Sequence, residues 1–264
     1  MDLQLQGKTA LVTGSTQGIG YAIAQQLLQE GATVIINGRT QARIDEAVNK
    51  LKKEIPKARV SGVPADFSKV ADVDALLKAV PEVDILVNNA GIFEPRPFVE
   101  ITDAEWFRFF EINVMSGIRL SRHYFPKMLA KNWGRIIFIS SESSIMIPTE
   151  MIHYGFTKTA QLAVSRGLAE LTAGTGVTVN SVLPGPTRSE GVEDFIKQIG
   201  ESKGLTPQQT EANFFKDARP GSLLQRFITV QEIANMVTYV ASPLSAATNG
   251  AALKAEGGLV KSIV

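Results

Sequence analysis

The chain has 264 residues, of which 44% are hydrophobic and 20% are charged. This length allows one or two domains with a sizeable core, and the composition is that of a folded globular protein, not a disordered or fibrous one. The 27 basic and 26 acidic residues give a formal net charge of +1, so no overall field favours nucleic acid or an acidic membrane surface. The chain has no cysteine and two histidines, which excludes disulfides, thiolate nucleophiles and a multi-histidine metal centre.

Targeting and membrane signals are missing from the sequence. No apolar run approaches the ~20 residues that cross a bilayer, and residues 1–4 lack the charged and apolar regions of a signal peptide. We therefore expect a cytoplasmic protein with no membrane and no nucleic acid partner, a setting that suits a chain without cysteine.

Seven apolar segments rich in β-branched residues predict strands that are covered on both faces. They are residues 8–13, 33–37, 59–63, 83–88, 135–140, 177–183 and 251–254. After the first of them, Ile19, Ile23 and Leu27 recur at the spacing of one helical face, and Gly31 supplies a stop. Repeated alternation of strands and helices predicts an α/β, Rossmann-type, doubly wound sheet of seven parallel strands with helices on both faces, in a single domain.

Capping signals mark later helix starts. Thr102 and Thr229 each precede a glutamate by three residues, and Thr206 is followed by proline. Residues 1–264 are interpreted as one dinucleotide-binding and catalytic domain, in which residues 190–226 interrupt the alternation as a short helical insertion. Such excursions beyond a strand's carboxyl end often carry substrate-binding elements.

A glycine-rich loop, Thr13-Gly14-Ser15-Thr16-Gln17-Gly18-Ile19-Gly20, joins the first strand to its helix. Glycine lets the backbone turn and approach a bulky anion, and the helix start offers free N–H groups and a positive dipole end. A structural turn would explain three glycines by themselves. Their position inside a βαβ unit favours a dinucleotide.

The second strand ends in Asn37-Gly38-Arg39-Thr40, without the carboxylate that usually binds a 2′-hydroxyl. Arg39 is suited to a 2′-phosphate, so NADP(H) is the expected cofactor, with NAD(H) as the alternative. A solvated Arg39 remains the competing interpretation, and Gln17 adds no second positive charge.

Tyr154 and Lys158 are four residues apart and leave the same face of a predicted helix. A free phenol has a pKa of ~10, and lowering it to about 7 requires ~4 kcal/mol, roughly what an ammonium ~4 Å away supplies at an effective dielectric near 20. A packed tyrosine beside a solvated lysine would explain the spacing in isolation. Ser140 and Ser141 end the fifth strand, where a hydroxyl can bind a carbonyl oxygen next to the phenol. Glu142 and His153, which lie close by, are expected to be solvated or locally bonded.

With these motifs in order, the sequence resembles the short-chain dehydrogenase/reductase family over essentially the whole chain. The cofactor motif is matched by Thr13-Gly14-x-x-x-Gly18-x-Gly20, the central-strand motif by Asn88-Asn89-Ala90-Gly91, and the active-site motif by Tyr154-x-x-x-Lys158. Asn113, Ser141 and Pro184-Gly185 stand at the family's positions as well. Ser189 replaces a threonine, and Ala255-Glu256 replaces the common Val-Asp.

The resemblance implies roles for these residues. Tyr154 would transfer the proton, Lys158 would lower its pKa and bind the nicotinamide ribose, Ser141 would hold the reacting oxygen, and Asn113 would anchor a water. The implied cofactor contacts are Gly14, Ser15, Thr16, Gln17, Gly18, Ile19, Gly20, Arg39, Asp66, Phe67, Asn89, Ala90, Gly91, Tyr154, Lys158, Pro184, Gly185, Thr187 and Ser189. No metal takes part, and a homotetramer or dimer is implied.

The expected function is an NADP(H)-preferring carbonyl reductase or alcohol dehydrogenase that acts on a small ketone or secondary alcohol. An apolar wall would favour a hydrophobic ketone; its candidates are Ile145, Met146, Ile147, Pro148, Met151, Phe214 and Phe215. Reduction of a 3-oxoacyl-[acyl-carrier-protein] is the alternative, but residues 188–226 hold six basic and six acidic residues and offer no basic entrance for an acidic carrier. A non-catalytic dinucleotide-binding regulatory protein is the alternative from another class, and it would not need Ser141, Tyr154 and Lys158 together.

Overall fold

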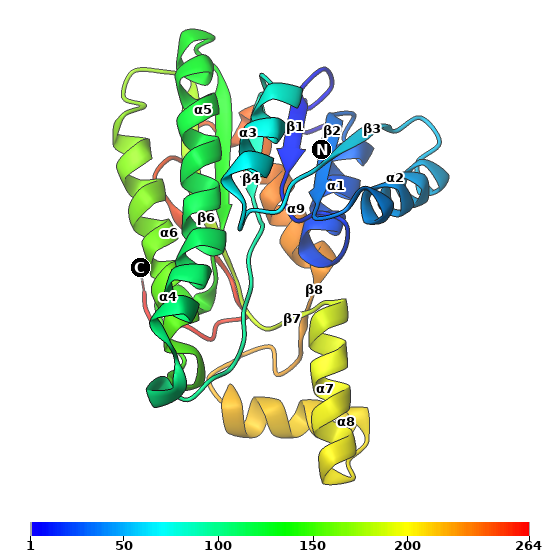
Figure 1. Cartoon of the computed structure of the whole chain (residues 1–264), viewed down its shortest axis with the longest axis vertical. Helices are drawn as coiled ribbons and strands as arrows, with labels where there is room; N and C mark the ends of the chain where they lie inside the picture. The colour runs from blue at the N-terminus through cyan, green and yellow to red at the C-terminus, as the bar shows by residue number, and fades with distance from the viewer. Residues whose placement is uncertain (1, 264) are drawn as a thin grey trace.

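In the computed structural model, which describes residues 2–263, seven parallel strands form a central sheet (Figure 1). Their order is β3-β2-β1-β4-β5-β6-β9. The strands are β1 (Thr9–Val12), β2 (Thr33–Gly38), β3 (Arg59–Pro64), β4 (Ile85–Asn88), β5 (Gly134–Ile139), β6 (Val177–Pro184) and β9 (Ala252–Ala255). Each predicted strand is present, with ends displaced by at most two residues, and the predicted fold class is confirmed.

Helices cover both faces of this sheet. The α-helices of the described residues are α1 (Gly18–Gln29), α2 (Gln41–Glu54), α3 (Val70–Ala79), α4 (Asp103–Phe110), α5 (Ser116–Ala130), α6 (Ile152–Glu170), α7 (Glu190–Lys203), α8 (Pro207–Asn213) and α9 (Val230–Ala241). Of these, α7 and α8 lie away from the two faces (Figure 1). One apolar core joins α1, α2 and α9 to the sheet, and a second joins α3, α5 and α6 to the opposite face. Alternation within a strand explains the two cores, since Ala10 and Val12 belong to the first and Leu11 to the second.

The predicted helix starts are confirmed. The side chains of Thr102, Thr206 and Thr229 each accept the backbone N–H three residues on, as capping boxes do. Gly31, just beyond α1, has a φ of 85°, a conformation that glycine adopts without strain. Between α4 and α5 lies a π-helical turn at Glu111–Met115. The side chain of Asn113 in this turn bonds to Ile92 in the loop that follows β4.

Residues 190–226 form a separate layer beyond the carboxyl ends of the strands, where Figure 1 shows α7 and α8 projecting from the body of the molecule. Phe214, Phe215 and Phe227 pack with Ile196 into a small apolar cluster of their own. Two short parallel strands that the sequence did not reveal, β7 (Thr187–Arg188) and β8 (Ile228–Thr229), join the two ends of this segment. Within the described residues, no helix is both long and apolar enough to cross a membrane.

Candidate active site

A cavity of about 510 Å³ opens where the strands of the sheet end. Twelve of the residues expected to contact the cofactor line it: Gln17, Gly18, Ile19, Gly20, Asn89, Gly91, Tyr154, Lys158, Pro184, Gly185, Thr187 and Ser189. Ser141 lines it as well. Gly14, Ser15, Thr16, Arg39, Asp66, Phe67, Ala90 and Asn113 do not border this cavity. The structure thus brings together residues that are more than 170 positions apart in the chain.

The backbone conformation and the close neighbours of the glycine loop require glycine at these positions. Gly14 and Gly18 have φ values of 58° and 60°, which other residues adopt only with strain. At Gly20 a Cβ would lie 2.4 Å from the carbonyl oxygen of Gly14 and 2.5 Å from Nδ2 of Asn89. The first turn of α1 has no side-chain cap, because Gln17 makes no capping bond. The loop therefore combines a close backbone turn with uncapped helical N–H groups, as a pyrophosphate requires.

Asn89 fixes this loop to the end of β4. Its Nδ2 donates to the carbonyl oxygens of Thr13 at 2.8 Å and Gly14 at 2.9 Å. The hydroxyl of Thr13 in turn accepts the backbone N–H groups of Asn89 and Ala90, both at 2.9 Å. These bonds explain why the central-strand motif and the glycine motif act as one unit.

The middle of the glycine loop, at Thr16, approaches the end of β2. Gly38 lies against Thr16, since a Cβ at Gly38 would be 2.6 Å from the Thr16 methyl carbon. The next residue, Arg39, is exposed and makes no ion pair with any other described residue. Its charge helps to lower the pKa of Asp66, although the hydrogen bonds that this carboxylate accepts from Ser68 are the larger cause. Arg39 is consequently available to an added anion.

Lys158 is buried beneath the cavity. Its Nζ donates to the carbonyl oxygen of Ile139 at 2.9 Å and lies 3.4 Å from Oε1 of Gln161. Burial lowers the pKa of Lys158 to about 8, and the charge of Glu142 opposes this shift. The ammonium is therefore still protonated at neutral pH but close to titration.

Asn113 supports this arrangement from the π-helical turn. Its side chain donates to the carbonyl oxygen of Ile92 and to the hydroxyl of Thr157, both at 3.0 Å, and accepts the N–H of Ile92 at 2.8 Å. Its own carbonyl oxygen accepts a 2.6 Å hydrogen bond from Nε2 of Gln161. The family resemblance implies that Asn113 anchors a water, and in this structure its backbone carbonyl oxygen is bonded to the Gln161 amide. The sequence analysis missed Gln161, although its position three residues after Lys158 places it on the same helical face.

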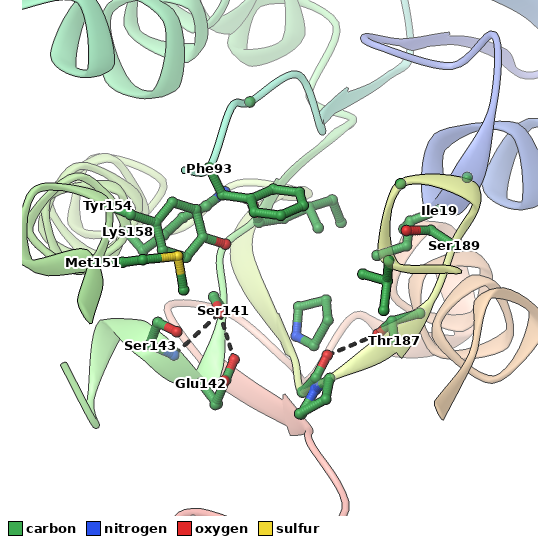
Figure 2. A pocket seen from close by; sticks show the side chains of 18 of the residues that line it. Ile19, Phe93, Ser141, Glu142, Ser143, Met151, Tyr154, Lys158, Thr187 and Ser189 are labelled. Carbon is green, nitrogen blue, oxygen red and sulfur yellow. Dashed lines mark hydrogen bonds between the residues drawn. The ribbon is translucent and has the colours of Figure 1, made fainter. Parts of the chain in front are cut away.

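Tyr154 reaches the cavity above Ser141 and Glu142 (Figure 2). Burial raises the pKa of the Tyr154 phenol, the charge of Glu142 raises it further, and the Ser141 hydroxyl acts in the opposite direction. The sequence predicted that Lys158 lowers the pKa of Tyr154, whereas in the structure this pKa is raised. The structure therefore favours the protonated phenol, which is the form that donates a proton.

Glu142 is locally bonded, as expected, but it is not solvated. Its residue is 6% exposed and lines the cavity, and its Oε2 accepts a 2.5 Å hydrogen bond from Oγ of Ser141. Ser141 Oγ also accepts the N–H of Ser143 at 3.1 Å. Burial is the main cause that raises the pKa of Glu142, while the Ser141 bond and Arg219 oppose it. His153 is neither solvated nor in the cavity. Its side chain is buried, and the centroid of its ring lies 4.0 Å from that of Phe109.

Arg219 enters the cavity from the segment at residues 190–226 and was not expected from the sequence. Its Nε lies 3.7 Å from Oε1 of Glu142, and its Nη2 lies 3.3 Å from Oε1 of Glu150. Arg219 lies 77 residues after Glu142 in the sequence. Local patterns of residues, such as helical spacing, therefore do not predict this contact.

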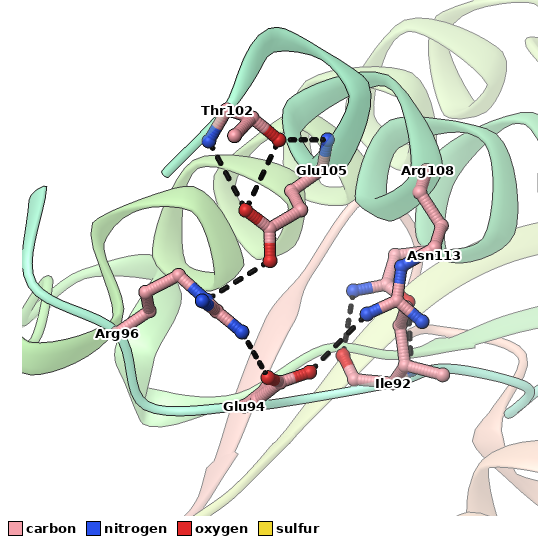
Figure 3. A network of polar contacts seen from close by, with 7 residues as sticks. All are labelled: Ile92, Glu94, Arg96, Thr102, Glu105, Arg108 and Asn113. Carbon is pink, nitrogen blue, oxygen red and sulfur yellow. Dashed lines mark hydrogen bonds and ion pairs between the residues drawn. The ribbon is translucent and has the colours of Figure 1, made fainter. Parts of the chain in front are cut away.

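The loop that follows β4 forms another wall, carrying Phe93 into the cavity. Figure 3 shows how ion pairs hold this loop against α4. Arg96 pairs with Glu94 at 2.7 Å and with Glu105 at 2.9 Å, and Arg108 pairs with Glu94 at 3.2 Å. These contacts fix the position of the wall relative to the Asn113 turn.

The apolar wall predicted from the sequence is present only in part. Met151 and Phe214 line the cavity, whereas Phe215 is buried in its own cluster. Ile145, Met146, Ile147 and Pro148 do not line it, and the first three are exposed. Glu256, the departure from the usual aspartate, is buried and accepts the N–H groups of Leu259 and Val260, which gives it a structural role.

The residues present fit a dinucleotide, on the observation that the glycine cradle would be filled by a Cβ at Gly20 and lies against uncapped helical N–H groups. The loop at residues 14–20 would hold the pyrophosphate, Arg39 and Asp66 would meet the adenosine half, and Lys158, Thr187 and Ser189 would meet the nicotinamide half. Within the part of the chain that the structure describes, no group of three potential metal ligands occurs.

The chain is similar to known oxidoreductases in sequence and in structure. The model of the short chain dehydrogenase family matches residues 8–199. YvaG, an uncharacterized oxidoreductase of Bacillus subtilis, is 54% identical over 100% of both chains. The 3-oxoacyl-[acyl-carrier-protein] reductase FabG of Aquifex aeolicus is 30% identical over 98% of this chain and 100% of its own. The crystal structure of L-sorbose reductase from Gluconobacter frateurii, complexed with NADPH and L-sorbose, matches 100% of both chains with a TM-score of 0.94 and 30% identity.

The fold and the site define an α/β oxidoreductase of the class that interconverts CH–OH and C=O groups. The chain belongs to the short-chain dehydrogenase/reductase family.

Proposed function

We propose that the protein is an NADP(H)-dependent carbonyl reductase or alcohol dehydrogenase that moves a hydride between the nicotinamide and a small ketone or secondary alcohol. The observation that carries the proposal is the convergence of Ser141, Tyr154 and Lys158 on one cavity that the glycine loop also lines. A protein that only bound dinucleotide would have no need of this polar group beside the cradle.

Proton transfer is assigned to Tyr154. The bound dinucleotide would supply the hydride for reduction, or accept it in oxidation. In reduction the hydride reaches the carbonyl carbon, and the Tyr154 hydroxyl gives its proton to the carbonyl oxygen, so that C=O becomes CH–OH. Lys158 stabilises the phenolate that remains, because its buried ammonium lies 5.6 Å from the centroid of the Tyr154 ring. The phenolate must then recover a proton before the next reduction.

Ser141 is assigned to the reacting oxygen. Its single proton is donated to Glu142 in this structure. Because burial raises the pKa of Glu142, a neutral carboxyl is favoured, and such a carboxyl can donate to Ser141 instead. The serine proton is then available to the substrate oxygen. Ser141 and Tyr154 together would hold that oxygen from two directions.

The preference for NADP(H) rests on Arg39, which is exposed and without an ion pair among the described residues. The similarity to L-sorbose reductase, whose structure contains NADPH, supports the same cofactor. NAD(H) is the alternative. A homotetramer or dimer, formed through the helices α4, α5 and α6 as the family resemblance implies, is proposed with it, and the cytoplasmic location stays a prediction.

Reduction of 3-oxoacyl-[acyl-carrier-protein] is the second candidate, favoured by the similarity to FabG. Two features count against an acyl-carrier protein as the partner. Residues 188–226 carry no excess of positive charge for an acidic carrier, and Arg219 is already paired with two carboxylates. Residues 190–226 stay the proposed substrate-loop insertion within a single domain of residues 1–264.

The test is a panel of ketones, aldehydes, acyl thioesters and alcohols, each assayed by absorbance with NADPH or NADH and with the oxidised cofactors. We expect reduction of ketones with NADPH in preference to NADH. Turnover confined to acyl-carrier thioesters would select the second candidate, and no turnover with any pair would overturn the assignment.

A further inference from the structure

Three ionisable side chains meet at the substrate end of the cavity, in a wall that is otherwise largely apolar. Arg219 lies between Glu142, 3.7 Å from its Nε, and Glu150, 3.3 Å from its Nη2. The exposed fractions of these side chains are 16%, 8% and 47%, respectively. Glu142 is thus the inner member of the cluster, and Glu150 lies at the mouth.

Glu142 is adjacent to the point where the reacting oxygen would bind. Its Oε2 is 2.5 Å from Oγ of Ser141, and Figure 2 shows both side chains beneath Tyr154. A group held by Glu142 would therefore be about one hydrogen bond away from the reacting oxygen. Two oxygens on adjacent carbons of a hydroxyketone have such a separation.

The carboxyl group of Glu142 can accept a further hydrogen bond. A carboxyl group has about four acceptor positions. The Ser141 hydroxyl occupies one of them, the backbone N–H and the hydroxyl of Ser143 also act on this carboxyl, and Arg219 stands farther off. One acceptor position is left for a substrate hydroxyl. Burial of a carboxyl is costly when its acceptors lack partners. Both the carboxylate and the neutral carboxyl can accept a hydrogen bond from a substrate hydroxyl, so this property does not depend on the protonation of Glu142.

The charge balance of the cluster selects a neutral substrate. Arg219 faces two carboxylates, one of which is exposed Glu150, so its positive charge is matched whether or not Glu142 is ionised. A substrate carboxylate or phosphate would find no unpaired guanidinium here and would lie close to negative charge. A hydroxyl donor has neither disadvantage.

We propose that Glu142 is a specificity-determining residue that accepts a hydrogen bond from a hydroxyl on the carbon next to the reacting carbonyl. The substrate class is then neutral hydroxyketones, with vicinal diols as the products of reduction. This inference rests on the proposed oxidoreductase function, and it replaces the hydrophobic ketone expected from sequence with a polar one.

The experiment compares two ketones of similar size, hydroxyacetone and butanone, which differ in a hydroxyl against a methyl group. The ratio of their kcat/KM values with NADPH is measured for the parent enzyme and for the variants Glu142→Ala, Glu142→Gln and Glu150→Gln. General effects on Ser141 or on folding cancel in this ratio. Calorimetric binding of hydroxyacetone to the enzyme with oxidised cofactor gives a readout without turnover, and thermal unfolding shows that each variant is folded.

We expect the parent to prefer hydroxyacetone at least about tenfold, and Glu142→Ala to reduce this preference at least about tenfold. Glu142→Gln, which keeps an amide oxygen, should lose less of it. Glu150→Gln should keep the ratio within about threefold, because Glu150 contacts Arg219 but not Ser141.

Two results would overturn the inference while leaving the proposed function intact. One is a preference of the parent for hydroxyacetone below about tenfold, and the other is a ratio that Glu142→Ala leaves within about tenfold of the parent value. Failure of any carbonyl compound to be reduced with either nicotinamide cofactor would overturn the proposed function and the inference together.

Discussion

The side chain of Gln161 joins Asn113 to Lys158. Its Nε2 donates a 2.6 Å hydrogen bond to the carbonyl oxygen of Asn113, and its Oε1 lies 3.4 Å from Nζ of Lys158. Gln161 is 2% exposed. The amide therefore ties the π-helical turn between α4 and α5 to the buried ammonium on α6, and it fixes two residues assigned to catalysis relative to each other.

Replacing Gln161 with leucine keeps its approximate volume but removes both hydrogen bonds. We expect the free energy of unfolding to fall by about 1–3 kcal/mol, because a buried carbonyl loses its side-chain donor. The value of kcat should fall with it, since Lys158 loses one of its two acceptors. Denaturant unfolding and steady-state kinetics measure the two effects. Gln41→Ala, an exposed change on α2, should stay within about 0.5 kcal/mol; equal behaviour of the two variants would contradict the role of Gln161.

Replacing Tyr154 with phenylalanine removes the proposed proton donor and leaves the ring. We expect kcat for ketone reduction to fall by about a hundredfold to ten-thousandfold, the usual contribution of a positioned acid, while NADPH still binds. Stopped-flow or steady-state absorbance gives the rate, and cofactor fluorescence gives the binding. Tyr239→Phe, on the exposed side of α9, serves as the matched control. A loss of less than tenfold would mean that Tyr154 is not the principal acid.

The pH profile should report Lys158. Its pKa is lowered by burial to about 8, so the ammonium is present below that pH and is lost above it. Reduction should then slow as the pH rises through about 8, because a neutral amine no longer stabilises the Tyr154 phenolate. The measurement is kcat/KM for a ketone in buffers from about pH 6 to about pH 10, a range that brackets the pKa of Lys158. In Lys158→Arg, which stays charged over this range, the decline should disappear; an unchanged decline would assign it to another group.

Arg39→Ala should distinguish the two cofactors. A charged hydrogen bond contributes about 1.5–3 kcal/mol, so the Kd of NADPH should rise by roughly tenfold to a hundredfold while that of NADH changes little. Arg43→Ala removes an exposed arginine in the first turn of α2 and is the control. Equal weakening of both cofactors by Arg39→Ala would remove Arg39 from phosphate recognition.

Two glycine substitutions should have opposite effects on stability. Gly20→Ala would place a Cβ 2.4 Å from the carbonyl oxygen of Gly14, so we expect a loss of about 2 kcal/mol or more and impaired cofactor binding. Gly167, inside α6, has no atom within 4 Å of an added Cβ. Gly167→Ala should therefore raise the free energy of unfolding by about 0.5–1 kcal/mol. Denaturant titration measures both, and a destabilised Gly167→Ala would show a contact at that surface.

The sequence by itself determined the strands, the helix starts, the glycine loop and the spacing of Tyr154 and Lys158. These depend on period, capping and backbone conformation, which are properties of residues a few positions apart. It also placed Ser141 correctly at the edge of the sheet, because parallel strands end on one side.

Only the tertiary structure decided what stands opposite these residues. It brought Arg219 to Glu142, placed Gln161 on Asn113, turned Met151 and Phe214 into the cavity, and left Ile145 to Ile147 outside it. It also showed that burial and a neighbouring carboxyl raise the pKa of Tyr154. The physical reason is the same in each case: contacts between distant segments depend on how whole layers pack, and local sequence patterns carry no information about that packing.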